Sequence, residues 1–211
     1  MKFISEKNIF LINKKLSETK FDGIIFFISD TDYSIFVNPL LASLNLFAEK
    51  WLYIHVKVGD FVYKYIDKNN LVEISLDFSY NNIFNKRAFA ANIRGPILYQ
   101  LSQTINSKRI IYTDIDNILV NNINQLFNQK KLYIRKVNIN YIDKILGSGR
   151  EIMQHKSGVI ILNTQEKEYL REDKFIIEFI KKYSEYCYSN LYIWFSDQIY
   201  LSKTINQIPN I

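Results

Sequence analysis

Continuous apolar runs restrict the fold of this chain more than any other feature of its sequence. A strand with one solvated face alternates apolar and polar residues, whereas a strand covered on both faces is apolar at nearly every position. Four runs are of the second kind: GIIFFIS (23–29), WLYIHVKV (51–58), RIIYT (109–113) and SGVIILN (157–163). Two further strands are indicated at 70–77 and 131–139. Such runs are typical of a parallel sheet that helices cover on both sides.

Segments with the apolar spacing of helices separate these runs. They cover 38–50, 86–105, 171–187 and 196–206. Asn38 and Pro39 are a typical helix start, and we expect Gly95–Pro96 to bend or divide the second helix. The alternation of strands and helices predicts an α/β fold, with a mainly parallel central sheet flanked by helices, in a single domain over 1–211.

Composition and charge exclude several classes of protein. The chain has 211 residues and a formal net charge of +6, which is too mild to predict nucleic-acid binding but is compatible with anionic ligands. The single cysteine, Cys187, rules out an internal disulfide and fits a reducing compartment, so a cytoplasmic location is expected. The sequence contains neither a signal peptide nor an apolar run long enough to span a membrane.

Basic residues gather in NQKKLYIRK (128–136). One interpretation is a solvated turn and strand edge. The other is a surface that meets acidic lipid or glycan, which would place the protein peripherally at an anionic inner membrane. The abundance of Ile, Asn and Lys indicates an AT-rich and therefore bacterial genome.

Acidic residues follow two of the expected strands, in ISDTDY (28–33) and TDID (113–116). Ligands of open α/β sheets bind at the carboxyl ends of the strands, so these two clusters lie where a ligand is expected. Residues two apart in an extended chain point the same way, so Asp114 and Asp116 can converge on one ion. Carboxylate oxygens suit Mg²⁺ or Mn²⁺, although a solvated turn would also explain the pair.

Four stretches, taken in order along the chain, carry a family likeness. They are FFISDTDYSIFVNPLLASL (26–44), AANIRGPILYQL with KRIIYTDIDNILVNNINQLF (90–127), KSGVIILNT (156–164) and FSDQIYLSKTIN (195–206). In these stretches the chain resembles the nucleotide-sugar glycosyltransferases of the GT-A fold. It is most similar to glycosyltransferase family 8, the group of glycogenin and of bacterial lipopolysaccharide galactosyl- and glucosyltransferases. The resemblance implies a Rossmann-like nucleotide-diphospho-sugar transferase fold over roughly 20–206.

The resemblance also implies roles for single residues. Asp114 and Asp116, with Ile115 between them, would form the Asp-x-Asp motif that holds Mn²⁺ or Mg²⁺ against the donor diphosphate. Asp30 and Tyr33 would hold the base and ribose beside Ser29, with Tyr33 stacking on the uracil.

Five further residues would surround the donor sugar by the same resemblance. Arg94 would lie near the diphosphate or the sugar, where a fixed cation stabilises the leaving charge. Gly158 would let the backbone approach the sugar, and Lys156 would contact it. Asp197 and Gln198 would line the reaction centre.

The implied reaction is transfer of a hexose from a UDP-sugar to a hydroxyl of a glycan, lipid or protein acceptor, with retention at the anomeric carbon, as in polysaccharide biosynthesis. The chain departs from the family at Lys156, where Asn is usual, and at Ile199, where an acid is frequent. It also ends before the family's metal-binding histidine motif. We therefore expect the core of a longer protein, a metal site completed by water, or a weakened metal site. Two alternatives stay open: a GT-A-like binding or scaffolding protein without turnover, and an inverting transferase with Asp197 as base.

Overall fold

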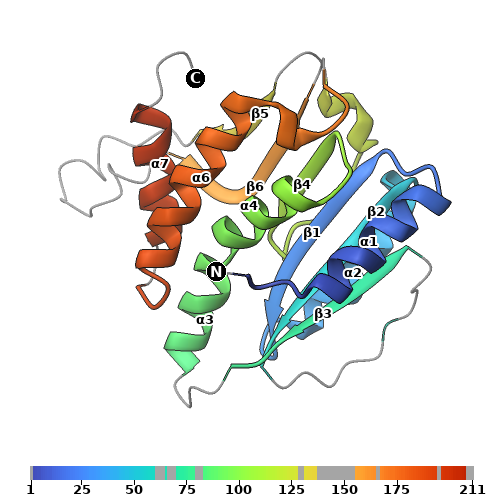
Figure 1. The fold of residues 1–211 in the computed structure, drawn as a ribbon. Coiled ribbons are helices and arrows are strands. Elements are labelled where there is room, and N and C mark those ends of the chain that lie inside the picture. Colours follow the sequence, from blue (N-terminus) through green and yellow to red (C-terminus); the bar gives the residue numbers. More distant parts are fainter. Residues whose placement is uncertain are drawn as a thin grey trace.

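A computed structural model describes residues 2–59, 65, 70–78, 83–127, 131–136, 155–164, 167–193 and 196–207. These residues form a six-stranded sheet in the order β3-β2-β1-β4-β6-β5 (Figure 1). Its strands are β1 (Gly23–Asp30), β2 (Trp51–Val58), β3 (Leu71–Leu76), β4 (Arg109–Thr113), β5 (Leu132–Lys136) and β6 (His155–Asn163).

The sheet is mainly parallel, as the continuous apolar runs predicted. β3, β2, β1 and β4 run in parallel, and β6 is antiparallel to both of its neighbours, β4 and β5. All eight residues of β1 are buried, because two strands flank it and helices cover both of its faces. The α/β prediction is therefore confirmed.

The helices are α1 (Glu6–Glu18), α2 (Val37–Phe47), α3 (Ile83–Asn92), α4 (Arg94–Thr104), α6 (Lys174–Ser189) and α7 (Ser196–Gln207). Single short turns of 3₁₀ helix lie at Ser34–Phe36, Ile123–Phe127 and Leu170–Glu172. Among the described residues, none of the helices is long and apolar enough to cross a membrane.

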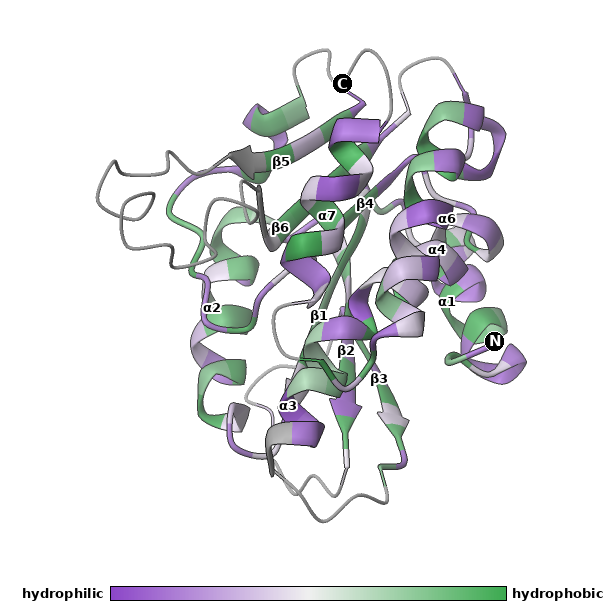
Figure 2. Ribbon diagram, turned by 90° about the vertical axis from the view of Figure 1, so that its left-hand side faces the viewer, coloured by the Kyte–Doolittle hydropathy of each residue, from purple (hydrophilic) through white to green (hydrophobic). Residues whose placement is uncertain are grey.

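Two apolar cores lie on opposite faces of the sheet. Ile24 and Phe26 of β1 point to one core, which also takes side chains from α1, α4 and α6. Ile25 and Phe27 point to the other core, which packs against α2. Figure 2 shows this division, with α2 on one side of the strands and α1, α4 and α6 on the other. The cores position the strand ends from which the site is built.

The starts of α2 and α6 differ from the sequence prediction, whereas the predicted division of the second helix is confirmed. α2 begins at Val37 with Phe36 in the capping position, so Asn38 lies inside the helix and is not its cap. The helix expected at 86–105 divides at Ile93, just before Gly95–Pro96. α6 begins later than expected, at Lys174, because the Asp173 carboxylate accepts the backbone N–H groups of Phe175 and Ile176.

α1 was not predicted, because its apolar face is narrow and charged residues interrupt it. Ile12 is its buried residue, and the hydroxyl of Ser5 caps it by accepting the N–H of Asn8. Of the strand expected at 131–139, residues 132–136 form β5, and 137–139 lie outside the described part of the chain.

Candidate active site

A cleft of about 200 Å³ opens at the carboxyl ends of β1 and β4. All of the sequence candidates except Gly158 and Lys156 line it: Ser29, Asp30, Tyr33, Arg94, Asp114, Ile115, Asp116, Asp197 and Gln198. Ile28, Arg87, Ala90, Ala91 and Tyr112 complete the lining. Strand ends supply one wall, and α3, α4 and the start of α7 supply the other. Segments far apart in the sequence therefore meet in one cleft.

Asp30 closes the turn after β1 and leaves one oxygen without a partner. Its Oδ1 accepts the backbone N–H groups of Asp32 (3.0 Å) and Tyr33 (3.1 Å), which holds Tyr33 at the cleft. Asp30 is only 1% exposed, and its Oδ2 is buried without a hydrogen-bond partner among the described residues. A buried acceptor of this kind is costly unless a ligand supplies a donor.

His55 stands behind Ser29 and fixes its hydroxyl. The Ser29 Oγ lies 2.7 Å from Nε2 of His55, and Nδ1 of His55 lies 2.7 Å from the hydroxyl of Tyr65. The imidazole also stacks on Phe27, with ring centroids 4.8 Å apart. Burial, with a smaller effect from Lys57, lowers the pKa of His55 to about 3, so the ring is neutral. A neutral ring orients the Ser29 hydroxyl without adding charge to the cleft.

Arg94 is the centre of a buried ionic network. Its Nη1 lies 3.1 Å from Asp114 Oδ1 and 3.4 Å from Asp197 Oδ2, and it donates to the Ser157 hydroxyl at 2.9 Å. The Ser157 hydroxyl in turn donates to Asp197. Burial alone lowers the pKa of Arg94, but Asp114 and Asp197 outweigh that effect and raise it. The guanidinium is therefore a fixed cation between two carboxylates.

Asp114 is oriented by two groups besides Arg94. The hydroxyl of Tyr112 donates to Asp114 Oδ1 at 2.5 Å, and the Asp114 N–H donates to the carbonyl of Gly158 at 2.8 Å. Any Cβ at position 158 would lie 2.7 Å from Asp114 Oδ2. Gly158 thus leaves room for the Asp114 carboxylate, and its expected contact with the sugar stays a prediction.

The carboxylates of Asp114 and Asp116 could supply two hard oxygen ligands to a cation. Oδ1 of Asp114 is engaged by Arg94 and Tyr112, and Asp116 is exposed where it lines the cleft. In the described parts of the chain, no three His, Cys, Asp or Glu side chains gather into a metal site. A six-coordinate Mn²⁺ or Mg²⁺ would fit this donor set only if ligand and water oxygens complete its shell.

Three sequence candidates cannot be placed in the same detail. Lys156 lies in β6, but its side chain is outside what the structure describes, as are those of Arg135 and Lys136 in the basic cluster. Lys131 of that cluster pairs with Asp173 at 2.9 Å.

Sequence reasoning missed four residues of the site region: Arg87, Tyr112, Ser157 and His55. Tyr112 directly precedes the TDID segment (113–116), and Ser157 directly precedes Gly158. Their position next to these motifs could have identified them as candidates. Arg87 and His55 join the site through contacts with Asp32 and Ser29, which are distant in the sequence. A local sequence pattern therefore does not identify them.

Comparison with known proteins shows what fold this is. No protein-family model and no curated protein matches the sequence. Among solved structures, the chain is similar to the galactosyltransferase LgtC in complex with donor and acceptor sugar analogs (TM-score 0.53, 14% identity, 84% of this chain and 69% of that one). An active-site Gln-to-Glu mutant of LgtC is similar at TM-score 0.52, with 13% identity over 86% of this chain and 70% of that one.

The bifunctional glycosyltransferase WbbM is similar at TM-score 0.52, with 11% identity over 85% of this chain and 36% of that one. At these identities the likeness establishes the fold. The chain thus has the GT-A fold of glycosyltransferases.

Proposed function

We propose that the chain is a glycosyltransferase that moves a hexose from a UDP-sugar to an acceptor hydroxyl of a glycan, lipid or protein, with retention at the anomeric carbon. The observation that carries the proposal is the meeting of Asp30–Tyr33, Asp114–Asp116, Arg94 and Asp197–Gln198 in one cleft of a GT-A fold. The composition fits a bacterial protein of the cytoplasm. The family resemblance implies a role in polysaccharide biosynthesis, and the basic cluster at 128–136 fits work at or near the membrane surface.

The nucleotide would occupy the β1 side of the cleft. Tyr33 offers a ring for stacking on uracil. Asp30 Oδ2, which has no hydrogen-bond partner in the described part of the chain, offers an acceptor for a base or ribose donor. The Ser29 hydroxyl, fixed by His55, gives this end of the cleft a second polar contact.

The diphosphate would lie at the β4 side. Asp114 and Asp116 would hold a divalent cation there, which supplies Lewis-acid stabilisation of the departing UDP when bound. Tyr112 and Gly158 hold Asp114 ready for this, and Arg94 adds fixed positive charge beside it. Preorganised charge of this kind needs no reorganisation during the reaction.

The acceptor hydroxyl would attack close to Gln198, which lines the cleft beside Asp197. The structure of an LgtC mutant in an active-site glutamine supports such a role for a glutamine in this fold. Asp197 is 2% exposed and is engaged by Arg94 and Ser157, so it is better placed to fix those groups than to act as the base of an inverting enzyme.

One observation favours a second candidate, a binding protein without turnover. Arg94 and Tyr112 already engage Oδ1 of Asp114, which reduces the oxygens left for a metal. Such a protein would bind a nucleotide sugar without needing a cation and would not hydrolyse or transfer it.

Metal-dependent nucleotide binding tests the proposal. We expect UDP to raise the Tm more with Mn²⁺ than with chelator, because a ligand that binds the folded state adds stability of RT ln(1 + [L]/Kd). Asp114→Asn and Asp116→Asn should each abolish the Mn²⁺ enhancement and lower any transfer by roughly 10²–10⁴-fold. Calorimetric titration of UDP into the three proteins, with Mn²⁺ and with chelator, measures this.

The controls separate the two candidates. Without ligand, Asp116→Asn should be as stable as the wild type or slightly more so, because Asp116 is exposed and one of two close carboxylates is removed. Asp114→Asn should be less stable than the wild type, because Arg94 loses one of the two carboxylates that face it. UDP binding that is equal with Mn²⁺ and with chelator would favour the binding protein, and failure of UDP to bind at all would refute both candidates.

A further inference from the structure

We propose that Arg87 is the side chain that binds the phosphate groups of the nucleotide in this cleft. The inference rests on the proposed function and adds a ligand contact on α3, which the Asp-x-Asp motif does not supply. Arg87 lines the cleft, seven positions before Arg94 along α3 and α4.

The charge of the cleft requires such a group. The described side chains that line it include four carboxylates, from Asp30, Asp114, Asp116 and Asp197. The cations in that lining are Arg87 and Arg94. A diphosphate therefore meets a cleft lining with more negative than positive groups. A cationic side chain that is free to turn toward the phosphates would contribute strongly to their binding.

Arg94 is not free to reorient. Besides its contacts with Asp114, Asp197 and Ser157, its Nε donates to the carbonyl of Ala91 at 2.6 Å, and its guanidinium lies 4.7 Å from the centre of the Tyr112 ring. Turning toward a ligand would leave the buried Asp197 and the half-buried Asp114 without their cation, which is unfavourable. Arg94 can stabilise charge from where it stands, but it cannot follow a ligand.

Arg87, in contrast to Arg94, is free to turn toward a ligand. Its Nη2 pairs with Oδ2 of Asp32 at 3.2 Å, and both side chains are well exposed, at 36% and 41%. Exposed ion pairs contribute little to stability, so exchanging Asp32 for a phosphate costs little. The Nε of Arg87 is buried without an acceptor among the described residues, so the present conformation leaves hydrogen-bonding capacity unused.

The position of Arg87 places it beside a bound nucleotide. Its guanidinium lies 5.5 Å from the centre of the Tyr33 ring, the ring expected to stack on the base. The planar guanidinium donates two parallel hydrogen bonds to phosphate oxygens, a geometry that lysine cannot reproduce. In a nucleotide whose base stacks on Tyr33, the phosphate on the ribose would therefore come close to this long side chain.

Comparing UDP, UMP and uridine tests the assignment. In Arg87→Ala we expect UDP affinity to fall about 10-fold or more, UMP affinity to fall as well, and uridine affinity to stay unchanged, because uridine lacks phosphate. Arg87→Lys should recover only part of the UDP affinity. Titration calorimetry with chelator present, so that no cation contributes, gives the three affinities for each protein.

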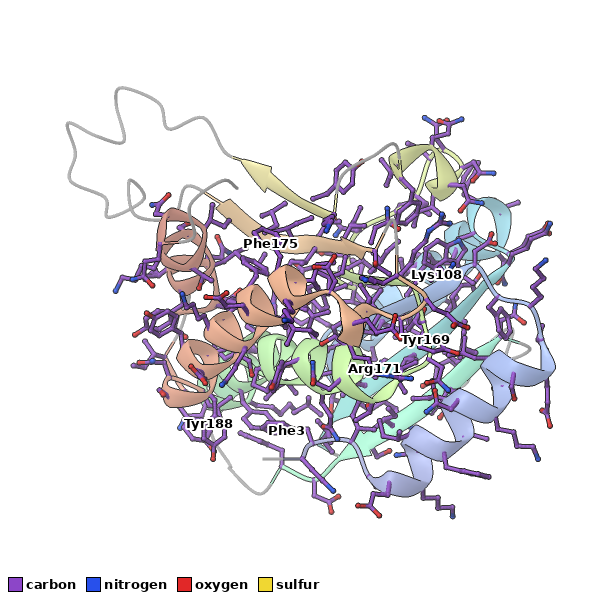
Figure 3. The ribbon with its side chains drawn as sticks, turned by 45° about the horizontal axis from the view of Figure 1, so that its top comes forward. Phe3, Lys108, Tyr169, Arg171, Phe175 and Tyr188 are labelled. Carbon is purple, nitrogen blue, oxygen red and sulfur yellow. The ribbon has the colours of Figure 1, made fainter. Side chains whose placement is uncertain are left out.

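Arg171→Ala is the matched control. Arg171 also packs a guanidinium against a tyrosine, 4.3 Å from the Tyr169 ring centre (Figure 3). It is not among the residues that line the cleft. It should leave all three affinities unchanged. Asp32→Asn, which releases Arg87, should leave UDP affinity equal or higher.

Other outcomes would overturn either the assignment of Arg87 or the proposed function. Equal losses for UDP and uridine in Arg87→Ala would mean a contact with the base, and an unchanged UDP affinity would mean no contact; either result overturns the inference alone. Wild-type protein that binds none of the three ligands, either with chelator or with Mn²⁺, would overturn the proposed function together with the inference. A ligand-free Tm for Arg87→Ala within 2 °C of the wild type, roughly the effect of a neutral surface change, shows that its fold is intact.

Discussion

At the scale of single residues, the site depends on polar groups whose ionisation the fold controls. Arg94 stays charged in a buried position because two carboxylates face it. His55 stays neutral because it is fully buried and its two ring nitrogens meet the hydroxyls of Ser29 and Tyr65. Both side chains hold their neighbours in place and are not themselves free to meet a ligand.

The shifted pKa of His55 makes the free energy of unfolding depend on pH. Its pKa falls from an ordinary 6.5 to about 3 on folding, so below pH 6.5 the unfolded chain binds a proton that the folded protein does not. We therefore expect the free energy of unfolding to be unaffected by His55 above pH 6.5. It should decrease by up to about 1.4 kcal/mol per pH unit as the pH falls from 6.5 toward 3.

Urea unfolding at several pH values, compared with His55→Gln, measures this contribution. The wild type should lose more stability than His55→Gln between pH 6.5 and pH 4. In NMR spectra the His55 ring should show no titration down to pH 4.5, and a midpoint near 6.5 would contradict the assignment.

At the scale of elements, the sheet and helices meet at glycines that leave no space for a side chain. A Cβ at Gly23, where β1 begins, would lie 2.6 Å from the Trp51 ring and 2.8 Å from the backbone oxygen of Arg109. At Gly95, where α4 crosses α6, it would lie 3.0 Å from the sulfur of Cys187. At Gly23 the overlap includes backbone of a neighbouring strand, which cannot move aside. At Gly95 the nearest atoms belong to the side chain of Cys187.

Alanine at these two glycines should destabilise the protein to different degrees. Gly23→Ala should cost about 3 kcal/mol, because β1 must separate from β2 or β4. Gly95→Ala should cost about 1 kcal/mol, because the gain in helix propensity offsets part of the overlap.

Chemical denaturation of both variants gives the ranking. Cys187→Ala should reduce the cost of Gly95→Ala in a double-mutant cycle, because it removes the sulfur that the new Cβ meets. Equal costs for Gly23→Ala and Gly95→Ala would contradict the distinction between backbone and side-chain overlap.

At the scale of the whole molecule, the Arg94 network ties four elements together. Arg94 begins α4, Asp114 follows β4, Ser157 lies in β6 and Asp197 lies in the first turn of α7. The cleft therefore depends on the packing of the whole domain around one buried guanidinium.

Removing that guanidinium should destabilise the domain strongly. Arg94→Ala leaves Asp114 and Asp197 close together without a cation, and we expect a loss of about 3–5 kcal/mol. Asp197→Asn added to Arg94→Ala should recover part of the loss, since it removes one of the two charges. Thermal and urea unfolding of the single and double variants test this; a double variant no more stable than Arg94→Ala would show that repulsion is not the cause.

Local sequence patterns were sufficient to predict the main strands, the fold class and the acidic residues at one edge of the sheet. These features can be predicted from local patterns. A continuous apolar run such as 23–29 predicts a strand that is buried on both faces, and Asp114 and Asp116 directly follow another such run, 109–113. The boundaries of α2 and α6 were less predictable, because capping depends on which side chain reaches the first free N–H groups.

The way these parts combine into a site depends on contacts between residues that are distant in the sequence. The tertiary structure set β6 antiparallel, placed Arg94 between Asp114 and Asp197, and joined His55 to Ser29. It also showed that Gly158 leaves room for the Asp114 carboxylate, and that Arg87 reaches the turn after β1 from α3. Each of these contacts joins residues that are 20 to 103 positions apart. Local propensity carries no information about such pairs, because burial and packing of the whole domain choose each partner.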